Sequence, residues 1–427
     1  MTSSSSEEQT PSNERTHRVS RNRSHTFVAL LVAAVGLVLA AILGLVAYMN
    51  LTATPIHPAA KNVSSVARAA ARPEWAVAVE QARQIARAAV VEQNLPGVSA
   101  AVGVGDDIVW AEGFGWADLE SRVPVAPQTR FRIGEVSIPL TSAGVGLLVE
   151  KKRLNLDDEI QAYVPEYPRK AWPVTLRQLM GHMAGVTTDA GDEAPLGRRC
   201  ERTVDGMQLD DFGRRALLFE PGTRYRLSTY GWILVSAAME AAAREPFFTF
   251  MRARVFEPLG MNDTTPEVAS EQIADRATWY FPRFAGNPRY GPELAREGDH
   301  SCFAGAGAFL STPSDLVRFG MAIANGQLLQ PATVRLLQTP QRLASGEETG
   351  YGLGWSVETV SLAGESTRMA GHGTKSDFIG GTASLMTFPD RGIVVAVTSN
   401  ISFADTKSVA LKIAQAFAEQ GRRGSRR

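Results

Sequence analysis

The sequence predicts a mixed α/β fold of the α+β type, with an antiparallel sheet flanked by helices and one transmembrane helix ahead of it. Two pairs of β-rich runs, each joined by a short turn, predict hairpins at 98–114 and 382–400. Apolar residues recur at helical spacing in 74–93 and 405–418, which predicts an amphipathic helix beside each hairpin. The third observation is the uncharged run 27–49.

The run 27–49 has 23 residues, enough for a helix to cross a hydrocarbon core of about 30 Å. A secretory apolar region typically has about 7 to 15 residues, so an uncleaved anchor is the better interpretation. The alternative is a long signal peptide cleaved at 51–53. The positive-inside rule puts the N-terminus in the cytoplasm and the large domain outside, in the periplasmic or extracytoplasmic space, because only Lys61 follows closely while four arginines precede the run: Arg15, Arg18, Arg21 and Arg23.

Composition gives the remaining boundaries. We expect a disordered cytoplasmic tail at 1–25, the anchor at 26–49, a linker at 50–73, one large domain at 74–420 and a disordered basic tail at 421–427. Lys and Arg number 44, as do Asp and Glu, so the whole chain offers no electrostatic case for nucleic acid.

The segment that organises the large domain is 131–141, with the sequence FRIGEVSIPLT. It resembles the Ser-x-x-Lys motif that opens a buried helix in the serine β-lactamase and penicillin-binding-protein superfamily. In that motif the lysine lies one helical turn beyond the serine and takes its proton. Here the serine position is Glu135 and the lysine position is Ile138.

Three further segments carry the resemblance: 227–229 (Leu-Ser-Thr), 255–261 (Val-Phe-Glu-Pro-Leu-Gly-Met) and 371–374 (Gly-His-Gly-Thr). In the superfamily a tyrosine at the position of Leu227 relays protons. A Lys-Thr-Gly or His-x-Gly triplet lines the site at the position of His372, and its last residue is a glycine where this chain has Thr374. The resemblance covers about 74–420 and is closest to the class C β-lactamase-related family, near its mitochondrial serine β-lactamase-like subgroup.

The resemblance implies a β-lactamase-like fold, in which an all-helical region joins the sheet, and it implies a ligand cleft. The nucleophile, base and tyrosine positions hold Glu135, Ile138 and Leu227, so we expect a membrane-anchored pseudoenzyme that acts through ligand or partner binding. Glu135 is then explained as a negative charge at a helix N-terminus, which is worth roughly 0.3 to 1 kcal/mol.

Two other functions stay open. The first is an active serine hydrolase (peptidase, esterase or β-lactamase-like) with a non-standard nucleophile, for which Ser228 with His372 as base is the candidate pair. Ser137 is a weaker candidate, because on a helix it points about 200° away from residue 135. The second is a structural envelope protein with an occluded cleft. His182, a lone histidine near a helix end, is more typical of a structural group than of a base.

The expected site contains no metal and no cofactor. The sequence does not identify the ligand, for which a cell-wall peptide, another peptide and a small molecule all stay open, and it does not fix the oligomeric state. The expected cleft residues are Glu135, Ile138, Leu227, Thr229, His372 and Thr374.

The chain has two cysteines, Cys200 and Cys302. Both lie in the part expected outside the cytoplasm, a compartment that permits disulfides. We therefore predict that they pair and tie the irregular loop 187–212 to the segment before residue 304.

Overall fold

The computed structural model describes residues 14–187, 199–200, 202–207, 212–268, 272–284, 286–295, 298–373 and 380–424. The chain divides into two compact units, Met1–Ala53 and Thr54–Arg427.

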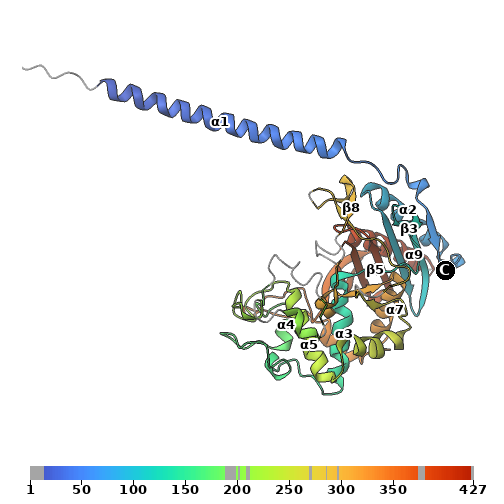
Figure 1. The fold of residues 1–427 in the computed structure, drawn as a ribbon. Helices are drawn as coiled ribbons and strands as arrows, with labels where there is room; N and C mark the ends of the chain where they lie inside the picture. The colour runs from blue at the N-terminus through green and yellow to red at the C-terminus, as the bar shows by residue number, and fades with distance from the viewer. Residues whose placement is uncertain are drawn as a thin grey trace, which may run out of the picture. The chain divides into compact units, whose positions relative to one another are not determined.

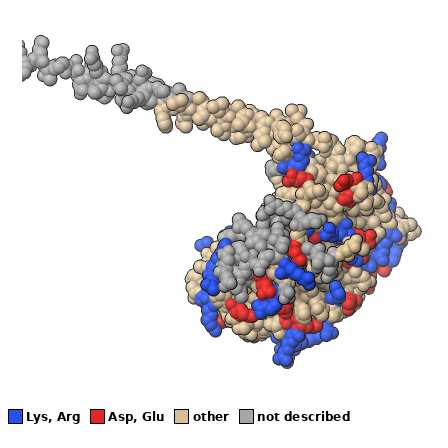
Figure 2. Space-filling view, in the orientation of Figure 1, with Lys and Arg blue, Asp and Glu red and all other residues tan. Residues whose placement is uncertain are grey.

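The first unit contains helix α1, Glu14–Leu51. Its segment Leu30–Leu51 has a mean hydropathy of 2.9 and is long and apolar enough to cross a membrane. In Figure 2 the part of this helix that is not drawn grey shows no charged side chain, whereas charges of both signs are interspersed over the visible face of the second unit. Helix α1 begins at Glu14, within the interval 1–25 for which a disordered tail was expected.

The second unit is a mixed α/β domain. Its helices are α2 (Ala76–Glu92), α3 (Ser137–Glu150), α4 (Leu176–Met180), α5 (Thr229–Ala243), α6 (Phe247–Met251), α7 (Pro313–Ala324), α8 (Pro331–Leu337) and α9 (Thr406–Gly424). Its strands are β1 (Ser65–Ala67), β2 (Gly97–Val104), β3 (Asp107–Asp118), β4 (Val123–Pro124), β5 (Phe131–Arg132), β6 (Thr265–Pro266), β7 (Tyr280–Pro282), β8 (Pro292–Leu294), β9 (Phe309–Ser311), β10 (Ser356–Leu362), β11 (Glu365–Gly373), β12 (Thr382–Phe388) and β13 (Ile393–Ser399).

The main sheet has the strand order β1-β3-β2-β13-β12-β11-β10 and is antiparallel throughout, with β4 pairing on β3. Both predicted hairpins are present, as β2–β3 and β12–β13, and β13 pairs with β2 to join them. The first and last segments of the domain therefore meet at the centre of the sheet. A small second sheet, β5-β9-β6, lies ahead of α3.

Helices cover both faces of the main sheet, because side chains alternate between two apolar cores. On β13, Val395 contributes to a core with α2 and α9, while its neighbour Ala396 contributes to a core with α3, α5 and α7. Figure 1 shows α3, α4 and α5 grouped apart from α2 and α9. This layered arrangement is the predicted fold class.

The interval 50–73, which was expected to be a linker, contributes a strand and hydrogen bonds to the folded domain. Its residues Ser65–Ala67 form β1, which adds an edge strand to the main sheet by pairing with β3. Earlier still, the amide Nδ2 of Asn94 donates to the carbonyl of Thr54 over 3.1 Å, and Oδ1 of Asn94 accepts from the amide of Ile56 over 2.8 Å. The folded unit therefore starts about twenty residues before the expected domain boundary. At the other end, α9 continues to Gly424 through most of the expected basic tail.

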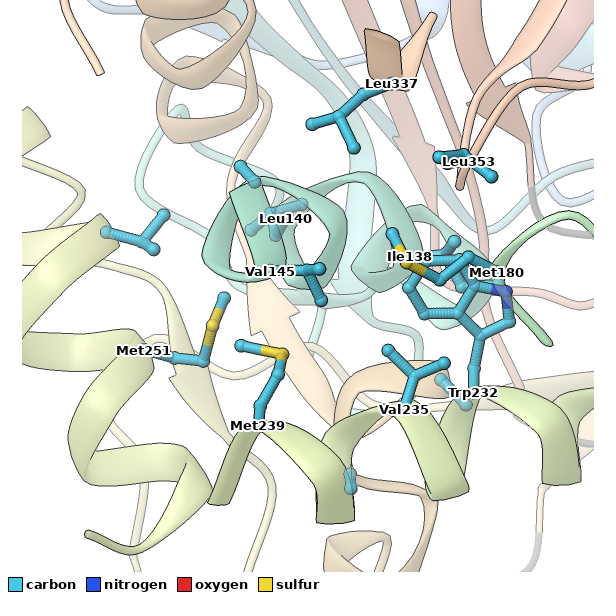
Figure 3. Close-up of a cluster of buried hydrophobic side chains, with 14 of the residues drawn as sticks. Ile138, Leu140, Val145, Met180, Trp232, Val235, Met239, Met251, Leu337 and Leu353 are labelled. Carbon is cyan, nitrogen blue, oxygen red and sulfur yellow. The ribbon is translucent and has the colours of Figure 1, made fainter. Parts of the chain in front are cut away.

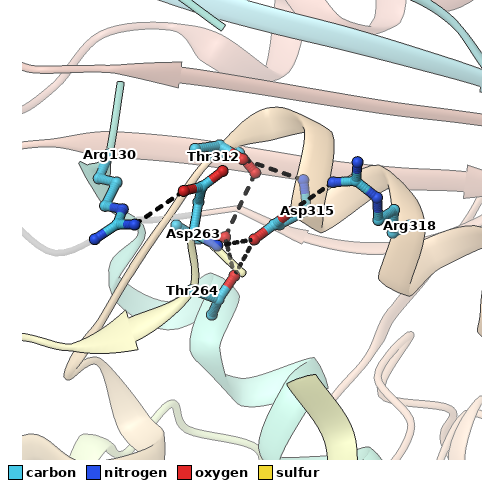
Figure 4. A network of polar contacts seen from close by, with 7 residues as sticks. Arg130, Asp263, Thr264, Thr312, Asp315 and Arg318 are labelled. Atoms are coloured by element: carbon cyan, nitrogen blue, oxygen red, sulfur yellow. Dashed lines mark hydrogen bonds and ion pairs between the residues drawn. The ribbon is translucent and has the colours of Figure 1, made fainter. Parts of the chain in front are cut away.

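Helix α7 is fixed at its start by a buried polar network (Figure 4). The hydroxyl of Thr312 accepts from the amide of Asp315 over 3.2 Å, as a Thr before a Pro predicts. The carboxylate of Asp315 accepts from the amide of Asp263 over 2.9 Å and from the hydroxyl of Thr264 over 3.0 Å, and it pairs with Arg318 at 2.7 Å. Burial raises the pKa of Asp315, and the hydrogen bonds oppose that rise. The network holds α7 to the segment before β6.

A fully buried ion pair lies where β5 leads towards α3. Nε of Arg132 is 2.6 Å and its second terminal nitrogen 2.9 Å from the two carboxylate oxygens of Glu267, and both side chains are at most 3% exposed. The indole nitrogen of Trp279 donates to the same carboxylate over 3.2 Å, and the guanidinium lies 4.8 Å above that ring. Both charges are almost completely removed from water, and their mutual attraction offsets part of the desolvation cost of each.

We predict that Glu267→Ala lowers the free energy of unfolding by about 3 to 5 kcal/mol, because it removes the carboxylate that makes two hydrogen bonds to the buried Arg132 charge. The measurement is urea unfolding of the full-length protein in detergent, followed by near-UV circular dichroism. The matched control is Glu348→Ala, which breaks an exposed pair with Arg342 and should cost less than about 1 kcal/mol. Equal losses in the two variants would contradict this role for the buried pair.

Candidate functional site

The position of Glu135 is set by a tight turn between β5 and α3. Gly134 has φ +49°, a conformation that favours glycine, and residues Gly134–Val136 form a single 3-10 turn before α3 begins at Ser137. This turn projects the half-buried Glu135 side chain into a pocket while Val136 enters the core.

The pocket has a volume of about 240 Å³. It is lined by Glu135, Tyr225, Leu227, Tyr351, Ser356, Glu358, Met369, Gly371, His372, Gly373, Thr382, Ser384, Leu385, Met386, Ala404, Asp405, Thr406 and Lys407. The cleft residues expected from the sequence that it brings together are Glu135, Leu227 and His372.

The pocket extends around one end of β11 to both faces of the sheet. Side chains alternate along a strand, so His372 faces one side and its neighbours Gly371 and Gly373 the other. Ladder pairing between β10 and β11 ends at the pair Ser356–Gly371, so the last residues of β11 lie beyond the end of β10. We call the part lined by Glu135, Tyr225, Leu227 and Tyr351 the inner end, and the part lined by Glu358 and the start of α9 the outer end.

Ile138, which was expected to line the cleft, is absent from the pocket wall. Its side chain is 1% exposed and belongs to the apolar core that also holds Met180 and Trp232, as Figure 3 shows. Burying an aliphatic side chain of this size contributes about 1.5 to 3 kcal/mol, whereas a lysine at the same place would need a route for its charge back to the pocket. The base position of the motif is therefore part of the core.

The other expected cleft residues have three different outcomes. Leu227 lines the pocket, and its side chain forms an apolar wall at the position where the superfamily has a tyrosine. Thr229 is the first residue of α5 and is not among the residues that line the pocket. Thr374 lies outside the described residues, as does the neighbouring Lys375.

Neither candidate hydroxyl nucleophile lies in the pocket wall. Ser137 is completely buried, and its hydroxyl has no hydrogen-bond partner among the described residues. The hydroxyl of Ser228 caps α5 by accepting from the amide of Gly231 over 3.0 Å, and it donates to the carbonyl of Thr187 over 3.0 Å. That hydroxyl is thus occupied in holding the helix start, and it makes no hydrogen bond with His372.

His372 instead pairs with a tyrosine. Its Nδ1 is 3.2 Å from the carbonyl of Gly373, and its Nε2 is 2.9 Å from the hydroxyl of Tyr351. A carbonyl can only accept, so Nδ1 carries a proton, and when the ring is neutral Nε2 accepts from the tyrosine hydroxyl. We assign this tautomer from the hydrogen-bond geometry.

Sequence reasoning assigned no functional role to Tyr225 and Tyr351, which both line the pocket. Their ring centroids are 5.7 Å apart. Burial raises the pKa of Tyr225 to about 12. Burial, then the neighbouring Tyr225 and Glu135, hold the pKa of Tyr351 well above its usual range. Both phenols therefore stay protonated near neutral pH and cannot act as bases. Two sequence features could have indicated these tyrosines. Tyr351 begins a Tyr-Gly-Leu-Gly-Trp run, and Tyr225 lies two positions before Leu227.

Among the described lining residues the one lysine is Lys407, at the outer end on α9. Its Nζ lies 2.8 and 3.0 Å from the two carboxylate oxygens of Glu358, so its charge is neutralised there. Within the described ranges no cluster of His, Cys, Asp or Glu is arranged to hold a metal ion.

Cys200 and Cys302 form a disulfide with Cα atoms 5.0 Å apart. Neither lines the pocket. Cys302 belongs to the 3-10 segment Ser301–Ala306, where the amide of Gly305 donates to the hydroxyl of Ser236 over 3.0 Å. The disulfide therefore joins the loop before residue 203 to a segment that packs on α5.

His182 lies behind the two tyrosines as a structural group. Its ring centroid is 4.8 Å from that of Tyr351, and its Nδ1 accepts from the amide of Ser228 over 3.1 Å. Burial, and next the nearby His372, lower the pKa of His182 from 6.5 to about 3.

We predict that the protein loses stability as the pH falls below 6.5. The unfolded chain binds a proton at His182 near pH 6.5, whereas the folded chain binds it only near pH 3, so each unit of pH between these values costs up to about 1.4 kcal/mol. His182→Asn, whose side chain tolerates the local φ of +57°, should make the slope of unfolding free energy against pH shallower between pH 6 and 4.5. Equal slopes in the two proteins, measured by urea unfolding, would contradict a buried neutral His182.

Comparison with known proteins places this geometry in a family. Serine beta-lactamase-like protein LACTB, mitochondrial, of Mus musculus is 26% identical over 476 residues, which cover 85% of this chain and 82% of the relative. Among solved structures, the octameric penicillin-binding protein homologue from Pyrococcus abyssi superposes with a TM-score of 0.65 at 22% identity, covering 78% of this chain and 76% of that one. The D-amino acid amidase from Ochrobactrum anthropi gives a TM-score of 0.65 at 24% identity, covering 82% of this chain and 99% of that one.

At these identities the two structures show a shared fold. The family model described as Beta-lactamase matches residues 82–419, from α2 through the sheet and into α9. That match spans most of the chain, and the protein therefore belongs to the β-lactamase family.

Proposed function

We infer that this protein is a membrane-anchored member of the β-lactamase family that binds a ligand in its pocket and does not carry out acyl transfer. The observation that carries this proposal is the inner end of the pocket, where a carboxylate stands at the nucleophile position and an apolar side chain at the tyrosine position. Ile138, which occupies the position of the general base, is buried in the core.

Acyl transfer in this fold needs a nucleophile and a group that removes its proton. The protonated phenols of Tyr225 and Tyr351 do not supply that base. His372 accepts a hydrogen bond from Tyr351, so its basic nitrogen is directed at a phenol and away from a serine. No specific observation favours the alternative of an active hydrolase that uses Ser228, because the hydroxyl of that residue caps α5.

In this function the pocket is the ligand-binding site. An occluded cleft would favour a purely structural role, whereas this pocket is open and lined by ionisable and aromatic groups. The ligand classes consistent with a pocket of this size are a small molecule or the end of a peptide, including a cell-wall peptide.

We predict that the protein forms no covalent adduct with a fluorescent penicillin or a fluorophosphonate, as measured by intact-protein mass spectrometry. Restoring one position should change nothing, because the three groups act as a unit. The triple variant Glu135→Ser, Ile138→Lys, Leu227→Tyr should acylate slowly, and its matched control replaces Glu135 with Ala in the same background. A stoichiometric adduct on the unmodified protein would exclude the proposal and, once mapped, would identify the nucleophile.

We also predict that 27–49 anchors the protein with its large domain outside the cytoplasm, because arginines precede the uncharged span. Protease added to intact spheroplasts should digest the large domain and leave a short N-terminal fragment in the membrane. A cytoplasmic marker protein controls for lysis. If the large domain survives until detergent is added, the topology is the reverse of the one proposed.

A further inference from the structure

We propose that a surface of the second unit, formed by Arg289, Tyr290, Leu294 and Phe403, binds the head-group layer of the membrane that the anchor crosses. We call it the hairpin surface, because three of its residues belong to the β7–β8 hairpin and the 3-10 turn within it. The inference rests on the anchoring part of the proposed function, and it concerns neither the pocket nor its ligand.

The chain leaves little room between the membrane and the start of the domain. The candidate span ends at Leu51, and Thr54 is the first residue of the second unit. The amide Nδ2 of Asn94 donates to the carbonyl of Thr54 over 3.1 Å, so the domain already holds that residue. An extended chain covers at most about 3.6 Å per residue, which keeps Thr54 within about 11 Å of the end of the span, whichever way the domain is turned.

The start of the domain and the hairpin turn are held by one side chain. The amide Nδ2 of Asn94 that reaches Thr54 also donates to the carbonyl of Arg289 over 3.4 Å, and Oδ1 of Asn94 accepts from the amide of Ile56 over 2.8 Å. Within the second unit, Figure 1 shows β8 at one end and α4 and α5 towards the other. The short tether therefore keeps the hairpin turn close to the membrane surface.

The side chains of the hairpin suit the boundary between water and lipid. Among the described residues of the second unit, Leu294 is the most exposed large apolar side chain, at 71%. The guanidinium of the exposed Arg289 lies 5.8 Å from the centre of the Tyr290 ring. Tyrosine is enriched at membrane interfaces, and an arginine there places its charge among the phosphates while its stem covers apolar surface. Leu294 gains free energy when it leaves water.

Phe403 adds an aromatic ring in a fixed position. Its φ of +64° is rare for a bulky residue and persists only where surrounding contacts hold it. Those contacts come from the hairpin: the rings of Phe403 and Phe281 are 5.6 Å apart, and a Cβ at Gly286 would lie 3.1 Å from the Phe403 ring. The ring is still 37% exposed. The hairpin therefore holds an exposed aromatic side chain beside its turn.

The experiment measures whether the hairpin surface touches lipid in the full-length protein. The protein is placed in nanodiscs of phosphatidylcholine and phosphatidylglycerol in equal parts, with or without bromine on the acyl chains near the head group. Asn287→Cys, an exposed position in the turn, carries a maleimide fluorophore, which Cys200 and Cys302 do not take because they are paired. We expect the brominated lipids to quench this label strongly and to spare the same label at Leu336→Cys on α8.

A longer tether separates binding from mere proximity. About thirty Gly and Ser residues inserted between Ala53 and Thr54 extend the reach of the tether by roughly 30 Å. The label at residue 287 should stay quenched in this protein, because the hairpin surface itself binds the membrane.

Two substitutions in the protein with the longer tether test the surface itself. Arg289→Glu and Leu294→Ser should each lower the ratio of bound to free domain about fivefold, the scale of one basic or one partly buried apolar contact. The matched controls Arg335→Glu and Leu336→Ser, both on α8, should leave the ratio unchanged. Near-UV circular dichroism establishes that each variant is folded.

Three outcomes would overturn the inference: no quenching at residue 287 with the natural tether, loss of quenching with the longer tether, or equal quenching in the parent and in both hairpin variants. Each of them can occur while protease still digests the large domain in spheroplasts, in which case the anchor stands and only the surface contact is wrong. Protein that fails to co-purify with the nanodiscs would contradict the anchor, and this inference with it.

Discussion

The site depends on the buried ion pair between Arg132 and Glu267. Arg132 is the last residue of β5, and Glu135 enters the pocket three residues later through one tight turn. A buried pair of this kind adds little net stability over a well-packed apolar pair, but its bidentate geometry allows few alternative positions. The turn before α3 is therefore fixed from the side of β5, and the direction of the Glu135 side chain follows from it.

The sequence predicted those elements whose formation depends on a few consecutive residues. The two hairpins, the flanking helices and the Thr312 cap of α7 each depend on a few consecutive residues, and the structure contains all of them. Strand β1 was not predicted, because three residues have no readable period and their pairing partner in β3 lies more than forty positions away.

The pocket was harder to predict than the fold because its walls come from distant segments. Motif spacing predicted that Glu135, Leu227, His372 and Ile138 line one cleft. The first three line the pocket, whereas Ile138 lies in the core. Whether that side chain faces ligand or core is decided by Met180 and Trp232, which arrive from α4 and α5. The tyrosine walls likewise come from two loops more than a hundred residues apart.

The disulfide gives the fold a dependence on its surroundings. It closes a loop across a separation of 102 residues, and that loop contains α5 and α6 and thus part of the larger apolar core. In the chain-entropy description, closing a loop of this length restricts the unfolded chain by about 4 to 5 kcal/mol, which is a large share of the total stability of a typical domain. A compartment that keeps thiols reduced would remove this contribution, so the domain is most stable where the redox conditions allow disulfides to persist.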